Sequence, residues 1–215
     1  IDFTDSYRKK LSAFFAAQLD SINRFNRAQL SETDRNSYDI FKREMEMSLE
    51  GLRLQCLPTS MYVIDGHLPM NQFWCLPLTL GQMGSGSGAQ PFHTVTDYDN
   101  WLKRAGHFSA WADSAIVYFR KGMATGYVLP EKLVVKMIPQ MQDMVVSGDL
   151  TKSLFYGPIT NMPDSFPGAD KSRLTGAYSA LIKESLSPAY QKLATFLKNE
   201  YLPRARPSTG IKDVP

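Results

Sequence analysis

The chain has 215 residues, of which 43% are hydrophobic and 21% are charged, and its formal net charge is +3 at pH 7. This composition excludes an intrinsically disordered tail, and the length is sufficient for one compact domain or two small ones. The positive charge is spread along the chain, so no basic stripe predicts a nucleic-acid partner. No window approaches the roughly 18 unbroken apolar residues of a transmembrane helix.

Apolar periodicity predicts a mainly α-helical fold, a multi-helix array of long amphipathic helices with loop-rich insertions. We expect a single helical domain over residues 1–215, or the N-terminal half of a larger domain. Its predicted parts are a helical hairpin at 1–56, an irregular loop region at 57–95, helices at 96–147, a loop at 148–169, a long kinked helix at 170–203 and a connection at 204–215.

The predicted hairpin consists of two amphipathic helices. In the first, apolar residues recur every three or four positions from Tyr7 to Phe25. The second opens at Ser31, with Asp34 three residues later as an approximate capping box, and keeps the same apolar period. A short polar turn between two such helices is typical of a helical hairpin.

A third helical period runs from about Thr96 to Met123. Thr96 is the predicted N-cap, and either Gly122 or Gly126 supplies the left-handed stop. We therefore expect one uninterrupted helix of about six turns here.

Two further helices follow. Pro130 is predicted at the first position of a helix over 131–146. The last long helix spans about 170–201 and contains Pro188. Either this helix kinks at the proline, or Ser187 caps a fresh helix that starts with it.

The loop-rich region contains few chemical signals. Residues 61–64 have the pattern of a short strand. Cys56 and Cys75 either form a disulfide that closes a loop of about twenty residues or are two small buried hydrophobes, and we favour the second alternative. Neither cysteine belongs to a Cys-x-x-Cys unit, so this pair does not predict a zinc site.

The run Gly84-Ser-Gly-Ser-Gly88 is the clearest candidate for a phosphate-binding loop, since bare backbone N–H groups can cradle an anion. A phosphate loop also needs Gly-Lys-Ser/Thr leading into a helix, and this run continues as Ala-Gln-Pro instead. We interpret the run as a flexible loop.

The three histidines, His67, His93 and His107, do not suggest a metal site. None lies within four residues of another, so no helical turn presents two imidazoles to one ion. A Ser–His–Asp arrangement lacks the supporting Gly-x-Ser-x-Gly elbow. We expect solvated or hydrogen-bonded structural roles for all three side chains.

Carboxylates and methionines are equally unspecific. Glu44 and Glu46 do not face each other on a helix, and Asp97 and Asp99 are expected in a first helical turn. The methionines Met137, Met141 and Met144 have the spacing of a helix core. The residues themselves therefore predict no catalytic, cofactor-binding or metal-binding position.

Four stretches resemble, in order and in spacing, motifs of one known family. They are Pro91-Phe92 with the Thr-Asp-Tyr-Asp-Asn-Trp-Leu run at 96–102, the stretch Arg120–Pro130, the Phe-Tyr-Gly-Pro run at 155–158, and Pro188-Ala-Tyr190 continuing to Glu200-Tyr-Leu-Pro203. Over nearly its whole length the chain resembles the bacterial domain-of-unknown-function family 885, whose members are predicted lipoproteins or secreted proteins.

The resemblance implies an α-helical fold similar to zinc metallopeptidases, with a His-Glu-x-x-His helix in a half beyond Pro215. In that motif two imidazoles bind zinc and the glutamate activates the metal-bound water. No His-Glu dipeptide occurs in these residues, so no catalytic residue is carried over. The resemblance also implies zinc in the missing C-terminal half, that half as the partner, a peptide substrate, and a periplasmic, outer-membrane-anchored or secreted protein.

Three functional hypotheses remain. In the leading one, the chain is the N-terminal, cleft-forming half of a zinc-dependent metallopeptidase-like hydrolase. In the second, it is a non-catalytic helical interaction or scaffold domain of an exported bacterial protein. A third and weaker hypothesis is an autonomous hydrolase built on His67 or His93.

Overall fold

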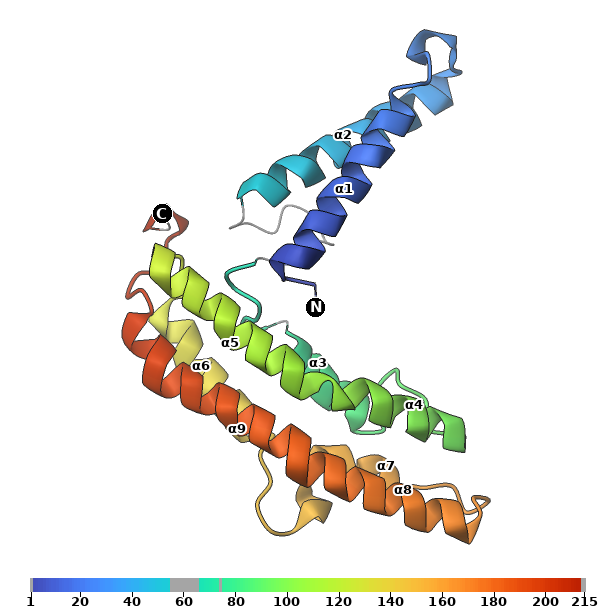
Figure 1. Cartoon of the computed structure of the whole chain (residues 1–215), viewed down its shortest axis with the longest axis vertical. Coiled ribbons are helices and arrows are strands. Elements are labelled where there is room, and N and C mark those ends of the chain that lie inside the picture. The colour runs from blue at the N-terminus through green and yellow to red at the C-terminus, as the bar shows by residue number, and fades with distance from the viewer. Residues whose placement is uncertain (1, 55–65, 74, 214–215) are drawn as a thin grey trace. The chain divides into compact units, whose positions relative to one another are not determined.

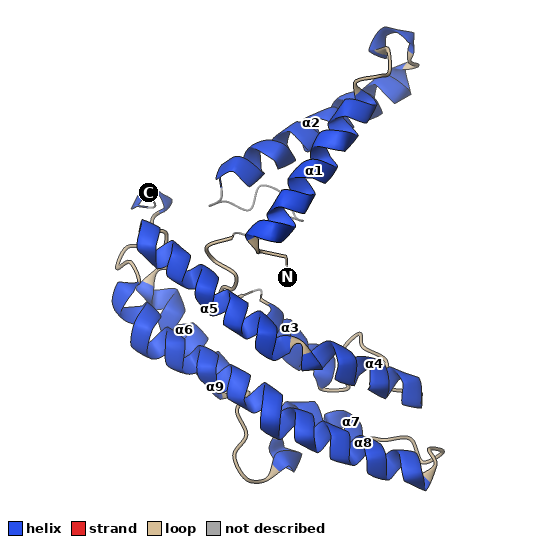
Figure 2. Cartoon of the chain, viewed as in Figure 1, coloured by secondary structure: helices blue, strands red, loops and turns tan. Residues whose placement is uncertain are grey.

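A computed structural model describes residues 2–54, 66–73 and 75–213, and it is mainly α-helical, which confirms the predicted fold class. Figure 2 shows helices joined by loops, and the described residues contain no β-strand. One isolated parallel bridge joins Pro130 and Arg206. The chain divides into two compact units, Ile1–Pro69 and Met70–Pro215, which are described separately below.

The main elements are α-helices of very different lengths. They are α1 (Asp5–Ile22), α2 (Glu32–Leu54), α3 (Leu76–Gly84), α4 (Val95–Gly106), α5 (Phe108–Thr125), α6 (Glu131–Gln142), α7 (Gly157–Thr160), α8 (Gly168–Leu181) and α9 (Ser187–Phe196). Two π-helical turns, Ile182–Leu186 and Leu197–Tyr201, follow α8 and α9. No helix in the described part of the chain is both long and apolar enough to cross a membrane.

The first unit is the predicted helical hairpin, in which α1 packs against α2 (Figure 1). Ser31 caps the start of α2 as expected. Its Oγ accepts the backbone N–H of Asp34 at 3.2 Å and donates to the carboxylate of Asp34 at 2.7 Å. At the other end of the hairpin, the guanidinium of Arg8 donates to the carbonyl of Leu52 at 3.1 Å. The apolar stripes meet in a thin core formed by Phe15, Met45 and Leu52, with Leu11, Leu19 and Leu49 packed against it.

In the second unit, α4 and α5 follow one another along the chain, and α8 and α9 form a second long row that runs in the same direction (Figure 1). The two rows contact each other through α4 with α8 and α5 with α9, while α6 packs against α9. Segments far apart in the sequence are therefore neighbours over the full length of this unit.

The predicted uninterrupted helix from Thr96 to Met123 is wrong in one respect, because the structure breaks it at His107. The N–H of His107 bonds to the carbonyl of Arg104, three residues back, which tightens and ends α4. Gly106 lies directly before the break, and glycine is a poor helix former. Of the two predicted stops, Gly126 ends α5, since this residue has a φ of 77° after the last turn, whereas Gly122 lies within the helix.

The start of α4 also differs from the prediction. Thr94, not Thr96, is the N-cap, and its Oγ1 accepts the N–H of Asp97 at 3.2 Å. The carboxylate of Asp97 accepts the N–H of Thr94 at 2.8 Å in return. This reciprocal capping box satisfies two backbone donors, an arrangement that a cap at Thr96 would forfeit.

The final helix runs through Pro188 without a new N-cap. Ser187 has helical dihedral angles, and its hydroxyl instead accepts the backbone N–H of Val146 at 3.3 Å. A proline inside a helix removes a hydrogen bond and clashes with the carbonyl four residues back. The π-helical turn Ile182–Leu186 lies directly before it, where the N–H of Ser187 bonds to the carbonyl of Ile182, five residues back.

The region at 57–95 was predicted to be an irregular loop, but it contains a helix. This is α3, which has Pro77 in its first turn, where a missing N–H costs nothing. The expected strand at 61–64 and Cys56 lie outside the described residues. Farther along, Pro130 is the N-cap of α6 rather than its first residue, and α6 ends at Gln142 rather than at residue 146.

Buried aromatic rings form the core of the second unit, and three tyrosines of the last helix fix the other segments to it. A buried tyrosine hydroxyl needs a hydrogen-bond partner, and here each finds a backbone group. Tyr178 donates to the carbonyl of Tyr98 (3.4 Å), Tyr190 donates to the carbonyl of Pro77 (2.6 Å), and Tyr201 accepts the N–H of Leu129 (2.8 Å).

Candidate functional site

A groove of about 670 Å³ lies between α5 and α9 and is the candidate functional site. Its floor is apolar, because Ile116 and Phe196 are almost fully buried, while Val117 on the rim is 49% exposed. The polar rim consists of Asp113 and Arg120 from α5 and Gln191, Lys192, Thr195, Asn199 and Glu200 from the last helix.

Two ion pairs cross the groove. Arg120 forms a bidentate pair with Glu200, with N–O distances of 2.6 and 2.7 Å, and the ammonium of Lys192 donates to the carboxylate of Asp113. All four side chains are about half exposed, so each pair contributes little to stability. Their main effect is that each charged group on the rim is neutralised by its partner.

The bidentate pair changes the proton affinity of both partners. Hydrogen bonding from Arg120 lowers the pKa of Glu200 below its ordinary value, against a smaller opposing effect of desolvation. The same hydrogen bonds raise the pKa of Arg120. Glu200 is therefore held as a carboxylate at neutral pH.

The second π-helical turn positions Asn199 and Glu200 on the groove. In this turn the N–H of Leu202 bonds to the carbonyl of Leu197, five residues back, and Pro203 follows at once. Turns of this kind occur often at functional sites. Each of the two π turns here also has a structural cause. A proline follows closely, Pro188 or Pro203, and it lacks the N–H donor that a regular helix would use.

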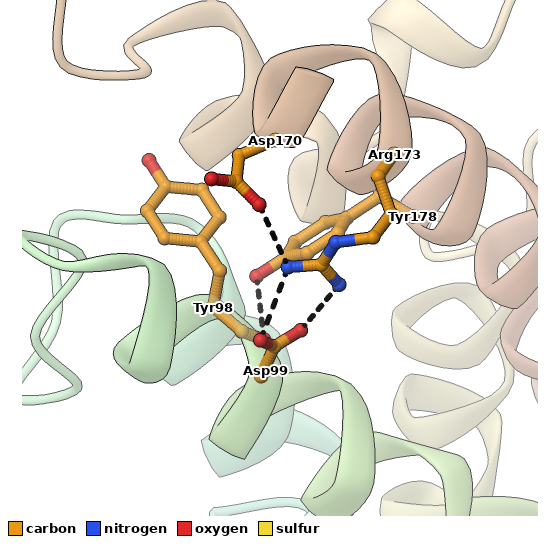
Figure 3. Close-up of polar contacts among 5 residues, drawn as sticks. All are labelled: Tyr98, Asp99, Asp170, Arg173 and Tyr178. Atoms are coloured by element: carbon orange, nitrogen blue, oxygen red, sulfur yellow. Dashed lines mark hydrogen bonds and ion pairs between the residues drawn. The ribbon is translucent and has the colours of Figure 1, made fainter. Parts of the chain in front are cut away.

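A second polar cluster joins α4 to α8 (Figure 3). Arg173 points toward Asp99 and Asp170 and binds the carboxylate of Asp99 at 2.8 and 3.1 Å. Tyr98 points away from this cluster, and its hydroxyl donates to the carbonyl of Pro158 at 2.8 Å. Burial raises the pKa of Tyr178 well above its ordinary value, so its hydroxyl stays protonated and donates its bond. These contacts join α4 to α8 and to the segment around Pro158.

The structure does not bring the three histidines together with other metal ligands. His93 is exposed beside the start of α4, where its backbone N–H bonds to Asp97, and His107 is exposed at the junction of α4 and α5. His67 is half-buried in the first unit. Among the residues that the structure describes, no three His, Cys, Asp or Glu side chains are grouped to hold a metal ion.

The glycine run at 84–88 packs closely against the segment at 155–158. A Cβ on Gly157 would lie 2.2 Å from the carbonyl oxygen of Ser85, and one on Gly84 would lie 2.5 Å from the ring of Trp101. The hydroxyl of Ser85 bonds locally, to the carbonyl of Gln82 in α3 and to the hydroxyl of Ser87. Close packing explains glycine at both positions, and Gly84 itself is the last residue of α3.

Cys75 is a free, buried thiol at the start of α3. Burial raises its pKa to about 11, so the reactive thiolate is scarce at neutral pH. These properties match the expectation of a small buried hydrophobe for this cysteine.

The chain matches the family described as a bacterial protein of unknown function (DUF885) over residues 1–213. It belongs to this family. The match confirms the resemblance drawn from the four motifs. No curated protein matches the chain.

A solved structure described as the putative lipoprotein from Colwellia psychrerythraea has the same fold, with a TM-score of 0.76 at 18% sequence identity. The similarity covers 98% of this family 885 chain and 36% of the Colwellia chain. The present chain thus spans about a third of the length of that relative.

No local pattern in the sequence indicates the groove. Its ion pairs join residues about 80 positions apart, and periodicity cannot indicate which two helices lie side by side. One usable signal was present: Asp113 and Arg120 are seven residues apart in α5, and Lys192 and Glu200 are eight apart, so complementary charges recur two turns apart on both helices.

Proposed function

We propose that this chain is the non-catalytic helical half of a longer metallopeptidase-like hydrolase, in which it forms one wall of the cleft for a peptide substrate. The supporting observation is the coverage of the fold match: almost all of this chain corresponds to 36% of a longer relative. In that relative, the fold is therefore one part of a larger protein.

The zinc ion of such an enzyme does not fit the residues present here. A catalytic zinc needs three protein ligands and an open position for water. The described residues contain no such group, and the sequence contains no His-Glu-x-x-His motif. The proposal therefore assigns the metal to a region outside these 215 residues and gives this chain no chemical step.

The proposal assigns to this half the tasks of shape and support. The last helix, fixed by its three tyrosine hydroxyls, makes a rigid wall. Positioning a substrate on rigid elements is a large part of catalysis, since a bound geometry replaces a diffusional encounter. The description of the Colwellia relative as a putative lipoprotein supports placing the protein outside the cytoplasm, either anchored or free.

A second candidate function is an interaction or scaffold module without any hydrolytic partner. It is favoured by the polar clusters of the second unit, which join helix to helix instead of pointing into a cavity. In this case the same surfaces would serve binding alone.

Peptide hydrolysis distinguishes the two functions. The polypeptide encoded by the complete reading frame and the 215-residue chain are purified and assayed on a library of unstructured peptides. We expect turnover by the longer polypeptide and none by the 215-residue chain. Turnover by the 215-residue chain would refute the proposal, and no turnover by a folded longer polypeptide would favour the scaffold function.

A further inference from the structure

We propose that the groove between α5 and α9 is the docking surface for another segment of the longer polypeptide, which inserts apolar side chains between the two ion pairs. This inference rests on the proposed function, and it adds the surface and the chemistry of the partner segment. It concerns only the second unit, in which the groove lies.

The dimensions of the groove fit apolar side chains from one helix. Asp113 and Arg120 are the α5 members of the two ion pairs. They are seven residues apart, which corresponds to about 10 Å along an α-helix. Side chains three or four positions apart on a helix are about 5–6 Å apart, so two of them fit in this interval. The floor beneath them is Ile116 and Phe196, with 4% and 6% of their surfaces exposed.

The charges of the groove favour an uncharged occupant. Each cation on the rim already binds a carboxylate, so the site has no unpaired charge to attract a phosphate, a nucleotide or an acidic peptide. A charged group entering the apolar floor would lose its hydration without gaining a partner. The groove therefore selects aliphatic or aromatic side chains, with polar neighbours that meet groups such as Gln191 and Asn199 on the rim.

The length of the relative indicates where such a segment comes from. About two thirds of the Colwellia chain has no counterpart in this fold match, so a relative with this fold carries enough additional chain to supply such a segment. Val117 is a large apolar side chain at the rim and is 49% exposed in the present chain. An intramolecular segment also binds at high effective concentration, so even this small groove can be occupied.

Thiol labelling measures the coverage of the groove directly. Val117→Cys places a thiol on its rim, and Val135→Cys is the matched control, because Val135 is 50% exposed on α6 outside the groove lining. Each variant is prepared in the 215-residue chain and in the polypeptide of the complete reading frame. Labelling by a small maleimide is followed at each site by peptide mass spectrometry, which separates these thiols from Cys56 and Cys75.

We expect both thiols to react at similar rates in the 215-residue chain, and the thiol at 117 alone to slow by at least about tenfold in the longer polypeptide. Equal rates at 117 in both polypeptides would overturn the proposal. Protection that grows with concentration of the 215-residue chain would also overturn it, since a second copy would then be the occupant. A reading frame that ends at Pro215 would overturn it by removing the segment.

The two proposals fail in different ways. Protection at residue 117 without peptide hydrolysis would refute the proposed function and leave the docking surface supported. Hydrolysis by the longer polypeptide without protection at residue 117 would support the proposed function and refute the docking surface. A charged variant adds a second measurement. In the longer polypeptide, Val117→Lys should speed amide hydrogen exchange of the groove residues of α5 and α9, whereas Val135→Lys should leave that exchange unchanged.

Discussion

The two units of the chain show two ways of holding helices together. The hairpin of α1 and α2 has a thin core around Phe15, Met45 and Leu52. The unit at 70–215 buries rings from helices that are distant in sequence, and tyrosine hydroxyls bond those helices to one another. The hairpin also leaves large apolar side chains exposed, namely Phe14, Phe25, Ile40, Phe41 and Met47.

This difference has a consequence for stability. A hairpin of two helices is formed mainly by contacts along one stripe, so it opens as a small local unit. The second unit depends on the contacts of α5 and α6 with the last helix, so a substitution at one contact also affects its neighbours. Substitutions in the two units should therefore differ in how far their effects spread.

The largest expected effect comes from removing a buried ring. Phe119→Ala should destabilise the second unit by about 3–5 kcal/mol, because the ring is fully buried against Phe196 and Tyr201. Phe15→Ala should remove exchange protection from the hairpin alone. Hydrogen–deuterium exchange by mass spectrometry resolves the two units, and Ile40→Ala, at an exposed side chain of the hairpin, is the control. Loss of protection throughout the chain on Phe15→Ala would contradict the comparison.

A pair of glycine substitutions tests the close packing inside the second unit. Gly157→Ala should cost about 1–3 kcal/mol, because its Cβ would lie 2.2 Å from the carbonyl oxygen of Ser85. Gly176→Ala in α8 has open space and should stabilise by about 0.5–1 kcal/mol. Urea denaturation gives both free energies of unfolding, and a neutral Gly157→Ala would show that the two segments are free to separate.

The cap of α2 gives a smaller effect that should stay within the hairpin. Ser31→Ala removes the acceptor for the N–H of Asp34 and should cost about 1 kcal/mol. Ser37→Ala, in the same helix, should be neutral or slightly stabilising, since alanine is the better helix former. Exchange rates over residues 32–54 report both changes, and faster exchange at 70–213 in either variant would contradict an effect confined to the hairpin.

The smallest expected effect concerns the ion pair of Arg120 and Glu200. Its half-exposed groups limit the contribution to less than about 1 kcal/mol, and salt reduces it further. The pKa of Glu200 is lowered in the folded state, so the stabilisation is present at neutral pH and disappears as the pH falls through the folded-state pKa, below the ordinary value of about 4.3. Glu200→Gln should therefore lower stability at pH 7, and this loss should shrink as the pH is lowered through the acid range. Glu184→Gln, at an exposed carboxylate, is the control, and a loss that does not change with pH would argue against the pair.

The sequence predicted the helices well wherever an apolar stripe or a stop signal was present and uninterrupted. The apolar stripes predicted both hairpin helices, and Gly126 ended α5 as expected because only a left-handed residue closes that turn. The break at His107 was missed because Phe108 and Trp111 continue the apolar period across it. The helix α3 was missed because Gly81 and Gly84 lie within it, although Trp101 and Met144 pack closely against these glycines.

The candidate groove belongs to a different class of feature. Its floor and ion pairs exist only because α5 and the last helix run side by side, and no local pattern encodes which helices pair. The π turn at 182–186 is similarly a response to Pro188, and the sequence indicated the proline without indicating how the helix accommodates it.

The central claim is that the hydrolytic centre lies outside these residues, and metal content tests it most directly. The 215-residue chain and the polypeptide of the complete reading frame are dialysed against the same zinc buffer, and the bound zinc is measured by plasma mass spectrometry. We predict tightly bound zinc in the longer polypeptide and none in the 215-residue chain. Stoichiometric zinc in the 215-residue chain would contradict the account.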